Sequence, residues 1–127
     1  MNKQIIITAG FFGLLAVVLG AFGAHALKAS LSATDLDTWK TGVSYQFYHT
    51  LTLLFLSSFS KYRSRLIIIA FYAFTLGIIF FSGSIYLLST HNITHISTSI
   101  IGPFTPLGGL FLILGWISLI LAAIKNK

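Results

Sequence analysis

The sequence contains no cysteine and has very few charges. Of its 127 residues, 8% are charged and 56% are hydrophobic. The lack of cysteine excludes a disulfide, a thiolate metal site and a cysteine nucleophile. The scarcity of charge excludes a soluble domain of this size, which would need a charged coat, whereas the hydrocarbon core of a bilayer rejects charge. The chain is therefore predicted to be an integral membrane protein.

Acidic residues are scarcer still, because Asp35 and Asp37 are the only two and there is no glutamate. Neither lies in an apolar stretch, so a carboxylate pair or a Ser-His-Asp triad is not available inside the membrane. We expect no enzyme activity, and no cofactor is predicted.

Four long apolar stretches without charge are each long enough to cross a bilayer, which takes about 20 residues. They cover residues 5–27, 42–60, 66–89 and 106–124. No alternation of apolar and polar residues indicates a barrel, so the stretches are predicted to be helices. The expected fold is all-α: a four-helix transmembrane bundle forming one integral membrane domain over residues 1–127.

The first stretch has an alternative interpretation as a cleaved signal peptide, because Ala24-His25-Ala26 resembles a cleavage site. Its apolar core is longer than the about 7 to 15 residues of a signal peptide, which favours a spanning helix.

The region before the second stretch predicts a short amphipathic surface helix. Ser32 and Asp35 are spaced like a capping box, with Leu36 and Trp39 expected to face lipid. This helix either lies on the outer surface or continues into the second span. Trp39, and Tyr62 at the other face, fit an aromatic belt at the membrane interfaces.

Basic residues predict the orientation, because loops rich in Lys and Arg stay in the cytoplasm. One side has two, Lys28 and Lys40, and the other side has six: Lys3, Lys61, Arg63, Arg65, Lys125 and Lys127. A multi-pass plasma-membrane protein with cytoplasmic N- and C-termini is therefore expected. The net charge of +6 also favours contact with anionic membrane lipids, and no nucleic-acid partner is expected because the charges are scattered.

Small residues recur at helical spacing and predict close packing of the helices. The fourth stretch should begin with Thr105 as N-cap and Pro106 at the first helical position. The small-residue stripes comprise Ala9, Gly13, Ala16, Gly20 and Ala24; Ala73, Gly77 and Ser84; and Gly108, Gly115, Ser118 and Ala122.

Polar residues gather in the half of the bundle predicted to lie on the non-cytoplasmic side. Tyr45, Gln46 and His49 share one face of the second stretch. The other members of this candidate site are His25, Ser82, Ser84 and Tyr86, with Thr105 nearby. Buried polar groups in a membrane need partners. Three interpretations follow: a structural network in which His49 bonds to Tyr86, a Ser hydroxyl or a backbone carbonyl; a ligand or ion site; or a proton relay or catalytic site.

Other histidine patterns are weak. His25 and His49 would suit a haem, but no attachment motif accompanies them. His91 and His95 share helical spacing without a third metal ligand, so no metal site is predicted. Asn92-Ile93-Thr94 matches a glycosylation pattern that often arises by chance.

Four ordered blocks carry a resemblance to a known family. They are Gly20-Ala21-Phe22-Gly23-Ala24-His25-Ala26-Leu27, Tyr45-Gln46-Phe47-Tyr48-His49-Thr50-Leu51, Phe81-Ser82-Gly83-Ser84-Ile85-Tyr86 and Gly102-Pro103-Phe104-Thr105-Pro106-Leu107-Gly108-Gly109. Together they resemble the domain of unknown function 423 family of small membrane proteins, which has YwdK-like and YgdD-like bacterial members and is similar to eukaryotic transmembrane protein 256. The resemblance covers nearly the whole chain. It implies a four-helix plasma-membrane protein without an established activity, and therefore no functional residues to transfer.

The first hypothesis is a non-enzymatic protein whose outer-half polar cluster binds a lipid, quinone or other amphipathic molecule, either as a homo-oligomer or in a membrane complex. The alternatives are a structural or assembly subunit of a membrane complex, and a small-solute or proton transporter acting as an oligomer. Neither internal repeats nor clearly broken helices, which are typical of transporters, are found in the sequence.

Overall fold

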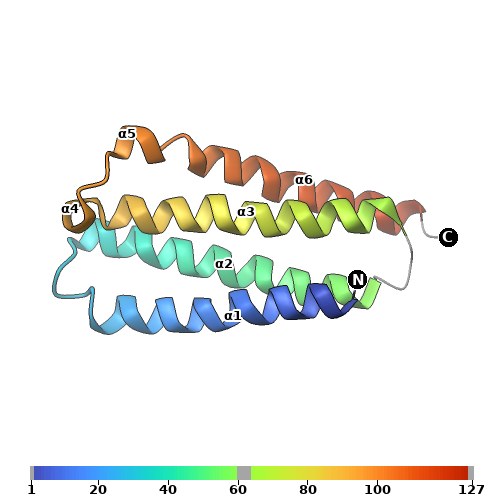
Figure 1. The fold of residues 1–127 in the computed structure, drawn as a ribbon, viewed down its shortest axis with the longest axis horizontal. Helices are drawn as coiled ribbons and strands as arrows, with labels where there is room; N and C mark the ends of the chain where they lie inside the picture. The colour runs from blue at the N-terminus through green and yellow to red at the C-terminus, as the bar shows by residue number, and fades with distance from the viewer. Residues whose placement is uncertain (1, 60–63, 126–127) are drawn as a thin grey trace.

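The computed structural model describes residues 2–59 and 64–125, and this part of the chain contains helices and no strand. Four long helices run side by side, each antiparallel to the next along the chain (Figure 1). The helices are α1 (Asn2–His25), α2 (Ala33–Phe59), α3 (Arg65–Ser89), α4 (His91–Thr94), α5 (Thr98–Ile101) and α6 (Phe104–Lys125).

Three segments of the described chain are long and apolar enough to cross a membrane: Asn2–His25, Arg65–Ser89 and Thr98–Lys125. The fourth long helix, α2, has 27 residues but carries Asp35, Asp37 and Lys40 in its first turns. These charges precede the apolar stretch predicted at 42–60, of which Ser60 lies outside the described residues. The all-α class and three apolar spans are therefore confirmed, and the crossing by α2 stays a prediction.

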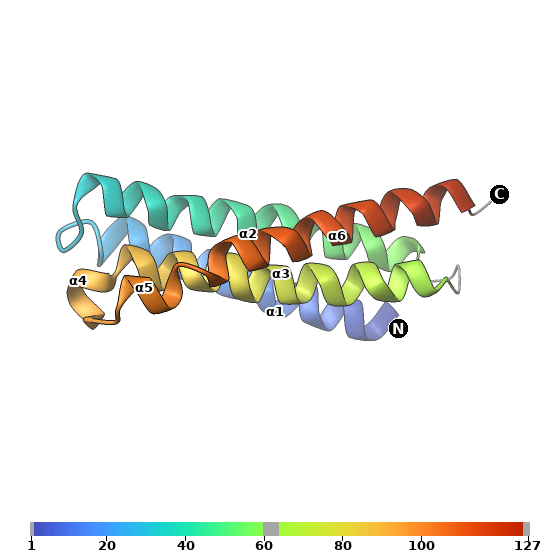
Figure 2. The same cartoon turned by 90° about the horizontal axis from the view of Figure 1, so that it is seen from above.

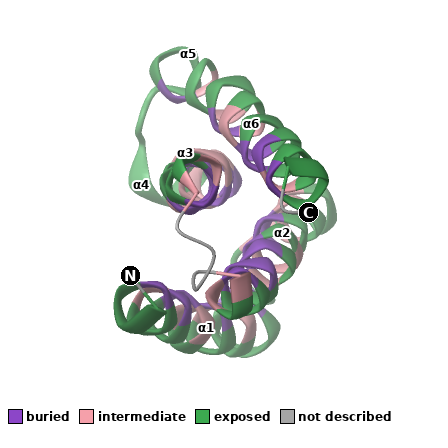
Figure 3. Ribbon diagram, turned by 90° about the vertical axis from the view of Figure 1, so that its right-hand side faces the viewer, coloured by how far each residue is buried: buried purple, intermediate pink, exposed green. Residues whose placement is uncertain are grey.

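Helix α3 lies in the middle of the arrangement. Viewed along the long axis, α1, α2 and α6 form an arc around it (Figure 3), and all four helices follow that axis in the perpendicular view (Figure 2). Helix α3 packs most extensively against α6, while α2 lies between α1 and α3. The buried apolar core draws on all four helices: Ile5, Ala9, Phe12, Leu53, Leu56, Ile67, Ala70, Phe71, Phe74, Ile78, Leu112 and Ala122.

Small residues at the helix interfaces explain this packing. A Cβ atom on Gly108 of α6 would collide with the backbone of Phe80 and Phe81 in α3. One on Gly115 would lie 2.7 Å from the ring of Phe74. Such close approach of backbones replaces the hydrophobic driving force that membrane helices lack.

The region before the second stretch continues into α2, which was one of the two predicted alternatives, but its tryptophan does not face lipid. Helix α2 begins at Ala33 and runs unbroken, and the Ser32 hydroxyl accepts the Asp35 N–H at 3.1 Å, so the cap itself is confirmed. Trp39 is only 5% exposed, which contradicts its predicted place in lipid and in an aromatic belt. The indole turns inward because its N–H has an acceptor there, the carbonyl oxygen of Leu19. Tyr62 lies outside the described residues.

The start of α6 also differs from the prediction. The helix begins at Phe104, so Thr105 and Pro106 lie inside its first turn and Thr105 is not the N-cap. Its hydroxyl lies 2.6 Å from that of Ser84 instead. The preceding connection contains the short helices α4 and α5.

Both ends of the chain lie at the same end of the molecule (Figure 1). Lys3, Arg65 and Lys125 belong to the helix ends gathered there, whereas Lys28 and Lys40 belong to the opposite end. This grouping agrees with the predicted separation of charge. Lys61, Arg63 and Lys127 lie outside the described residues.

Candidate functional site

Gln46 joins three helices through its side-chain amide. Its Nε2 donates to the carbonyl oxygen of Phe12 in α1 at 2.8 Å, and its Oε1 accepts the Tyr86 hydroxyl of α3 at 2.6 Å. Only 3% of Gln46 is exposed. A buried amide with both ends bonded fixes the relative position of the helices that it connects.

His49 lies one turn further along α2 and has both ring nitrogens occupied. Its Nδ1 is 2.7 Å from the carbonyl oxygen of Tyr45, and its Nε2 accepts the indole N–H of Trp116 in α6 at 3.2 Å. A carbonyl needs a donor and an N–H needs an acceptor, so the hydrogen sits on Nδ1 and the imidazole is neutral. Of the partners predicted for His49, the backbone carbonyl is the one found, whereas Tyr86 bonds to Gln46.

Two serines of α3 extend this set of contacts. Ser82 donates to the carbonyl oxygen of Gly42 in α2 at 2.8 Å. Ser84 pairs with Thr105 of α6 and also donates to the carbonyl oxygen of Phe81 at 3.0 Å. Both serines are buried, and each hydroxyl bonds across a helix interface.

The two tryptophans were not predicted as members of the cluster. Trp39 donates its indole N–H to the carbonyl oxygen of Leu19 in α1 at 2.9 Å, and its ring lies 4.6 Å from that of Tyr86. Trp116 donates to His49. The sequence did contain a signal for both tryptophans, because an indole N–H placed in an apolar bundle needs an acceptor. We call the contacts of Trp39, Gln46, His49, Ser82, Ser84, Tyr86, Thr105 and Trp116 the polar network.

Two predicted site residues lie outside the polar network. His25 ends α1 and is exposed, and its side chain has no hydrogen bond within the described part of the chain. Tyr45 supplies only its backbone carbonyl, and its side chain is 42% exposed with the ring 4.9 Å from that of Phe81. Five of the seven predicted site residues therefore take part in hydrogen bonds that link neighbouring helices.

The polar network is almost completely satisfied by the protein itself. In the described chain, the only buried side-chain nitrogen or oxygen without a partner is Oγ1 of Thr50. The network therefore links the helices to one another, and apolar surfaces lie beside it.

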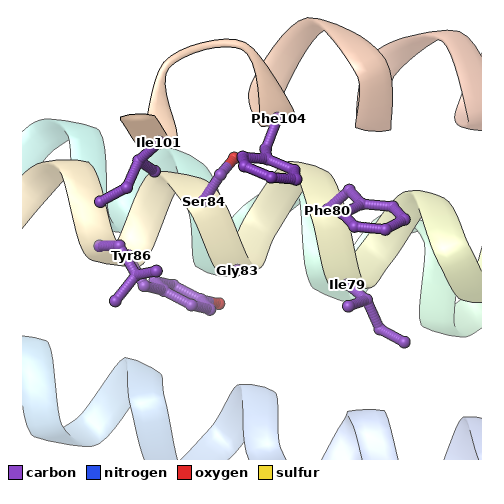
Figure 4. A pocket seen from close by; sticks show the side chains of 8 residues that line it. Ile79, Phe80, Gly83, Ser84, Tyr86, Ile101 and Phe104 are labelled. Atoms are coloured by element: carbon purple, nitrogen blue, oxygen red, sulfur yellow. The ribbon is translucent and has the colours of Figure 1, made fainter. Parts of the chain in front are cut away.

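One such surface is an apolar groove along α3, which we call the α3 groove (Figure 4). Its volume is about 540 Å³. Phe80, Phe104 and Ile101 form one side, and Ile79 and Tyr86 form the other, with Gly83 between them. Ser84 and Leu87 complete the lining. The groove opens outward, since Ile79 and Phe104 are 49% and 43% exposed.

Gly83 leaves the floor of the α3 groove open, because a Cβ atom there would meet nothing within 4 Å. A smaller cavity of about 210 Å³ adjoins it toward α1, and the two share Ile79, Gly83 and Tyr86. Tyr86 is held in place by Gln46 and Ser84 by Thr105, so the polar network positions the walls of the groove.

Comparisons with known proteins agree with the membrane character of the fold. The UPF0382 membrane protein YwdK of Bacillus subtilis (strain 168) is 41% identical over 125 residues, which cover 97% of this chain and 98% of the relative. The UPF0382 inner membrane protein YgdD of Escherichia coli (strain K12) is 35% identical over 130 residues, which cover 99% of this chain and 93% of the relative. No solved structure matches this chain.

A family model described as "Protein of unknown function (DUF423)" matches residues 19–109, which include α2, α3 and most of the polar network. The chain therefore belongs to the DUF423 family of membrane proteins.

Proposed function

We propose that this protein is a non-enzymatic plasma-membrane protein whose α3 groove holds the hydrocarbon chain of an amphipathic membrane molecule, a lipid or a quinone. The observation that carries the proposal is the groove itself. Its volume of about 540 Å³ falls within the about 300–1,000 Å³ typical of ligand sites, and its lining is apolar apart from the hydroxyls of Ser84 and Tyr86.

The polar network has a supporting role in this proposal. A groove that receives a flexible chain needs rigid walls, because ordering both partners would cost conformational entropy. The pairs Gln46–Tyr86 and Ser84–Thr105 fix opposite parts of the lining. Gln46 also lines the adjoining cavity. The second N–H of its amide is a donor for the polar end of the ligand.

We further propose four membrane crossings with both termini in the cytoplasm. Helix α2 packs lengthwise between α1 and α3, which are both apolar enough to cross. A helix in that position shares their direction through the bilayer and cannot lie flat on its surface. The location in the plasma membrane is supported by the relative from Escherichia coli, which is named an inner membrane protein.

Filling the α3 groove tests the proposal. The change Gly83→Leu places a side chain in open space, so the protein should fold while the groove closes. Gly10→Leu is the matched control, because a Cβ atom on Gly10 also meets nothing within 4 Å and this residue lies in α1, away from the groove.

The measurement is native mass spectrometry of protein purified in mild detergent, followed by extraction and identification of bound lipids and quinones. Wild type and Gly10→Leu should retain a long-chain molecule that Gly83→Leu loses. Equal retention by all three proteins, or none in wild type, would refute the proposed ligand site.

A second candidate, a structural or assembly subunit, is favoured by the internal satisfaction of the polar network. Under this alternative, weakening the network should dissociate a complex without changing bound lipid. Co-purification of wild type and of Gln46→Leu from native membranes separates the two candidates. The transporter alternative is less favoured, because both nitrogens of His49 are engaged in the closed network.

A further inference from the structure

A second cavity lies between α1 and α2, at the end of the molecule opposite the termini. Its volume is about 270 Å³, and we call it the α1–α2 cleft. The last turns of α1 form one side through small residues, and the second and third turns of α2 form the other. The lining residues are Gly20, Gly23, Ala24, Trp39, Lys40, Val43 and Ser44.

Lys40 and Ser44 give this cleft a polar rim. They are four residues apart in α2 and therefore lie on the same face of the helix. Within the described chain, the Lys40 ammonium forms no ion pair, even though Asp37 is one turn away, and the Ser44 hydroxyl has no hydrogen bond.

The free hydroxyl of Ser44 differs from those of three threonines on the same helix. Thr38, Thr41 and Thr52 each donate to the carbonyl oxygen four residues earlier. Ser44 makes no such bond, so its O–H is available to a ligand. An ammonium and a hydroxyl one turn apart are suitable donors for the oxygens of a phosphate group.

The floor of the cleft is apolar and shallow because of its small residues. At Gly23 the Trp39 indole occupies the space of a side chain, and at Gly20 a Cβ atom would lie 3.4 Å from the Cγ1 of Val43. Ala24 is exposed beside them. A hydrocarbon chain is the chemical group that matches such a surface inside a membrane.

The depth of Lys40 suits a lipid headgroup. It lies seven residues after the start of α2 at Ala33, or about 10 Å along the helix at about 1.5 Å per residue. Its flexible stem lets the ammonium reach the interface while the methylene groups stay in apolar surroundings.

We propose that the α1–α2 cleft binds one anionic phospholipid, whose phosphate accepts hydrogen bonds from Lys40 and Ser44 while an acyl chain lies over Gly20, Ala24 and Val43. The site uses helices and residues other than those of the α3 groove. It rests on the proposed crossing of α2 and not on the α3 groove, so its failure would leave the proposed ligand of the groove untouched.

The test compares binding of phosphatidylglycerol and phosphatidylcholine with identical acyl chains, titrated into detergent-purified protein and followed by native mass spectrometry. Wild type should prefer phosphatidylglycerol. Lys40→Gln should weaken its binding about fivefold, since one basic residue contributes about 1 kcal/mol at a lipid surface. Lys40→Arg should retain the preference, and Ser44→Ala should weaken binding without loss of thermal stability, because this hydroxyl has no partner in the described chain.

Lys28→Gln is the matched control, because Lys28 lies at the same end of the molecule but does not line the cleft. It should bind both lipids as wild type does, whereas Ala24→Leu, which fills the floor, should weaken both. The proposal is overturned by equal effects of Lys40→Gln and Lys28→Gln, which would indicate unspecific surface charge. Displacement of the lipid by an excess of inorganic phosphate would also overturn it, since the ligand would then be a free anion.

Discussion

At the scale of single residues, the polar network places most of its hydrogen bonds between helices. The Gln46 amide bonds to α1 and α3 at once, and Tyr86 depends on it for its hydroxyl partner. Hydrogen bonds between membrane helices contribute about 0.6 kcal/mol on average, with a maximum of about 1.7 kcal/mol. The pair is therefore expected to stabilise the fold modestly while fixing the wall of the α3 groove.

A double-mutant cycle measures this coupling. Gln46→Leu and Tyr86→Phe should each lower the unfolding free energy in detergent, and the double variant should lose less than the sum, by about 0.6–1.7 kcal/mol. Tyr48→Phe is the control, because this ring is 59% exposed and its hydroxyl has no hydrogen bond in the described chain. Strict additivity of the two changes would show that the Gln46–Tyr86 bond adds no stability.

The helical repeat in the sequence was sufficient to place Gln46 and His49 on one face of α2, and both residues are buried there. It did not reveal Trp116 or the inward turn of Trp39. Both indoles find acceptors on other helices, His49 Nε2 and the carbonyl of Leu19. Such partners depend on the rotation and depth of neighbouring helices, which the periodicity of a single segment does not specify.

At the scale of helices, the tightest contact is between α3 and α6. Gly108 lies against the backbone of Phe80 and Phe81, so no side chain can be accommodated without separating the helices. The neighbouring Gly109 faces a different environment, because a Cβ atom there would be 3.9 Å from the Phe81 ring, an ordinary contact. Two adjacent glycines therefore have different structural roles.

Replacing Gly108 and Gly109 separately by alanine tests whether the two glycines have different structural roles. Gly108→Ala should destabilise the protein by about 1–3 kcal/mol or more, because an overpacked interface must shift backbone. Gly109→Ala should stay within about 0.5 kcal/mol of wild type. Thermal unfolding in detergent provides the comparison, and equal stability of the two variants would contradict the close approach of α3 and α6.

Helix positions follow from the apolar stretches because a bilayer imposes length and excludes charge. The predicted first, third and fourth stretches differ from α1, α3 and α6 by three residues or fewer at each end. The start of α2 was harder to predict, since its first turns are polar and yet pack against α1 through Trp39. Hydropathy depends only on which residues a segment contains, whereas the inward direction of the Trp39 indole depends on its contact with α1.

At the scale of the whole molecule, the arc of α1, α2 and α6 around α3 leaves one side of α3 partly uncovered (Figure 3). The α3 groove lies along this helix, beside α5 and the start of α6. The sequence predicted polar residues in this half, with a ligand site as one interpretation, but not the position of the groove, because that depends on how the helices pack. The short helix α5 contributes Ile101 to its lining.

The number of crossings also belongs to the whole molecule and has a simple test. With four crossings, both termini lie on one side of the membrane, whereas a surface-bound α2 would leave three crossings and place the termini on opposite sides. The chain lacks cysteine, so single cysteines report position without background. Asn2→Cys and Lys125→Cys should react with an impermeant maleimide only after the cells are permeabilised, whereas Ser32→Cys and Asn92→Cys should react in intact cells. Labelling of Asn2→Cys and Lys125→Cys from opposite sides of the membrane would exclude the fourth crossing. It would also exclude the lengthwise position of α2 between α1 and α3, on which the polar network depends.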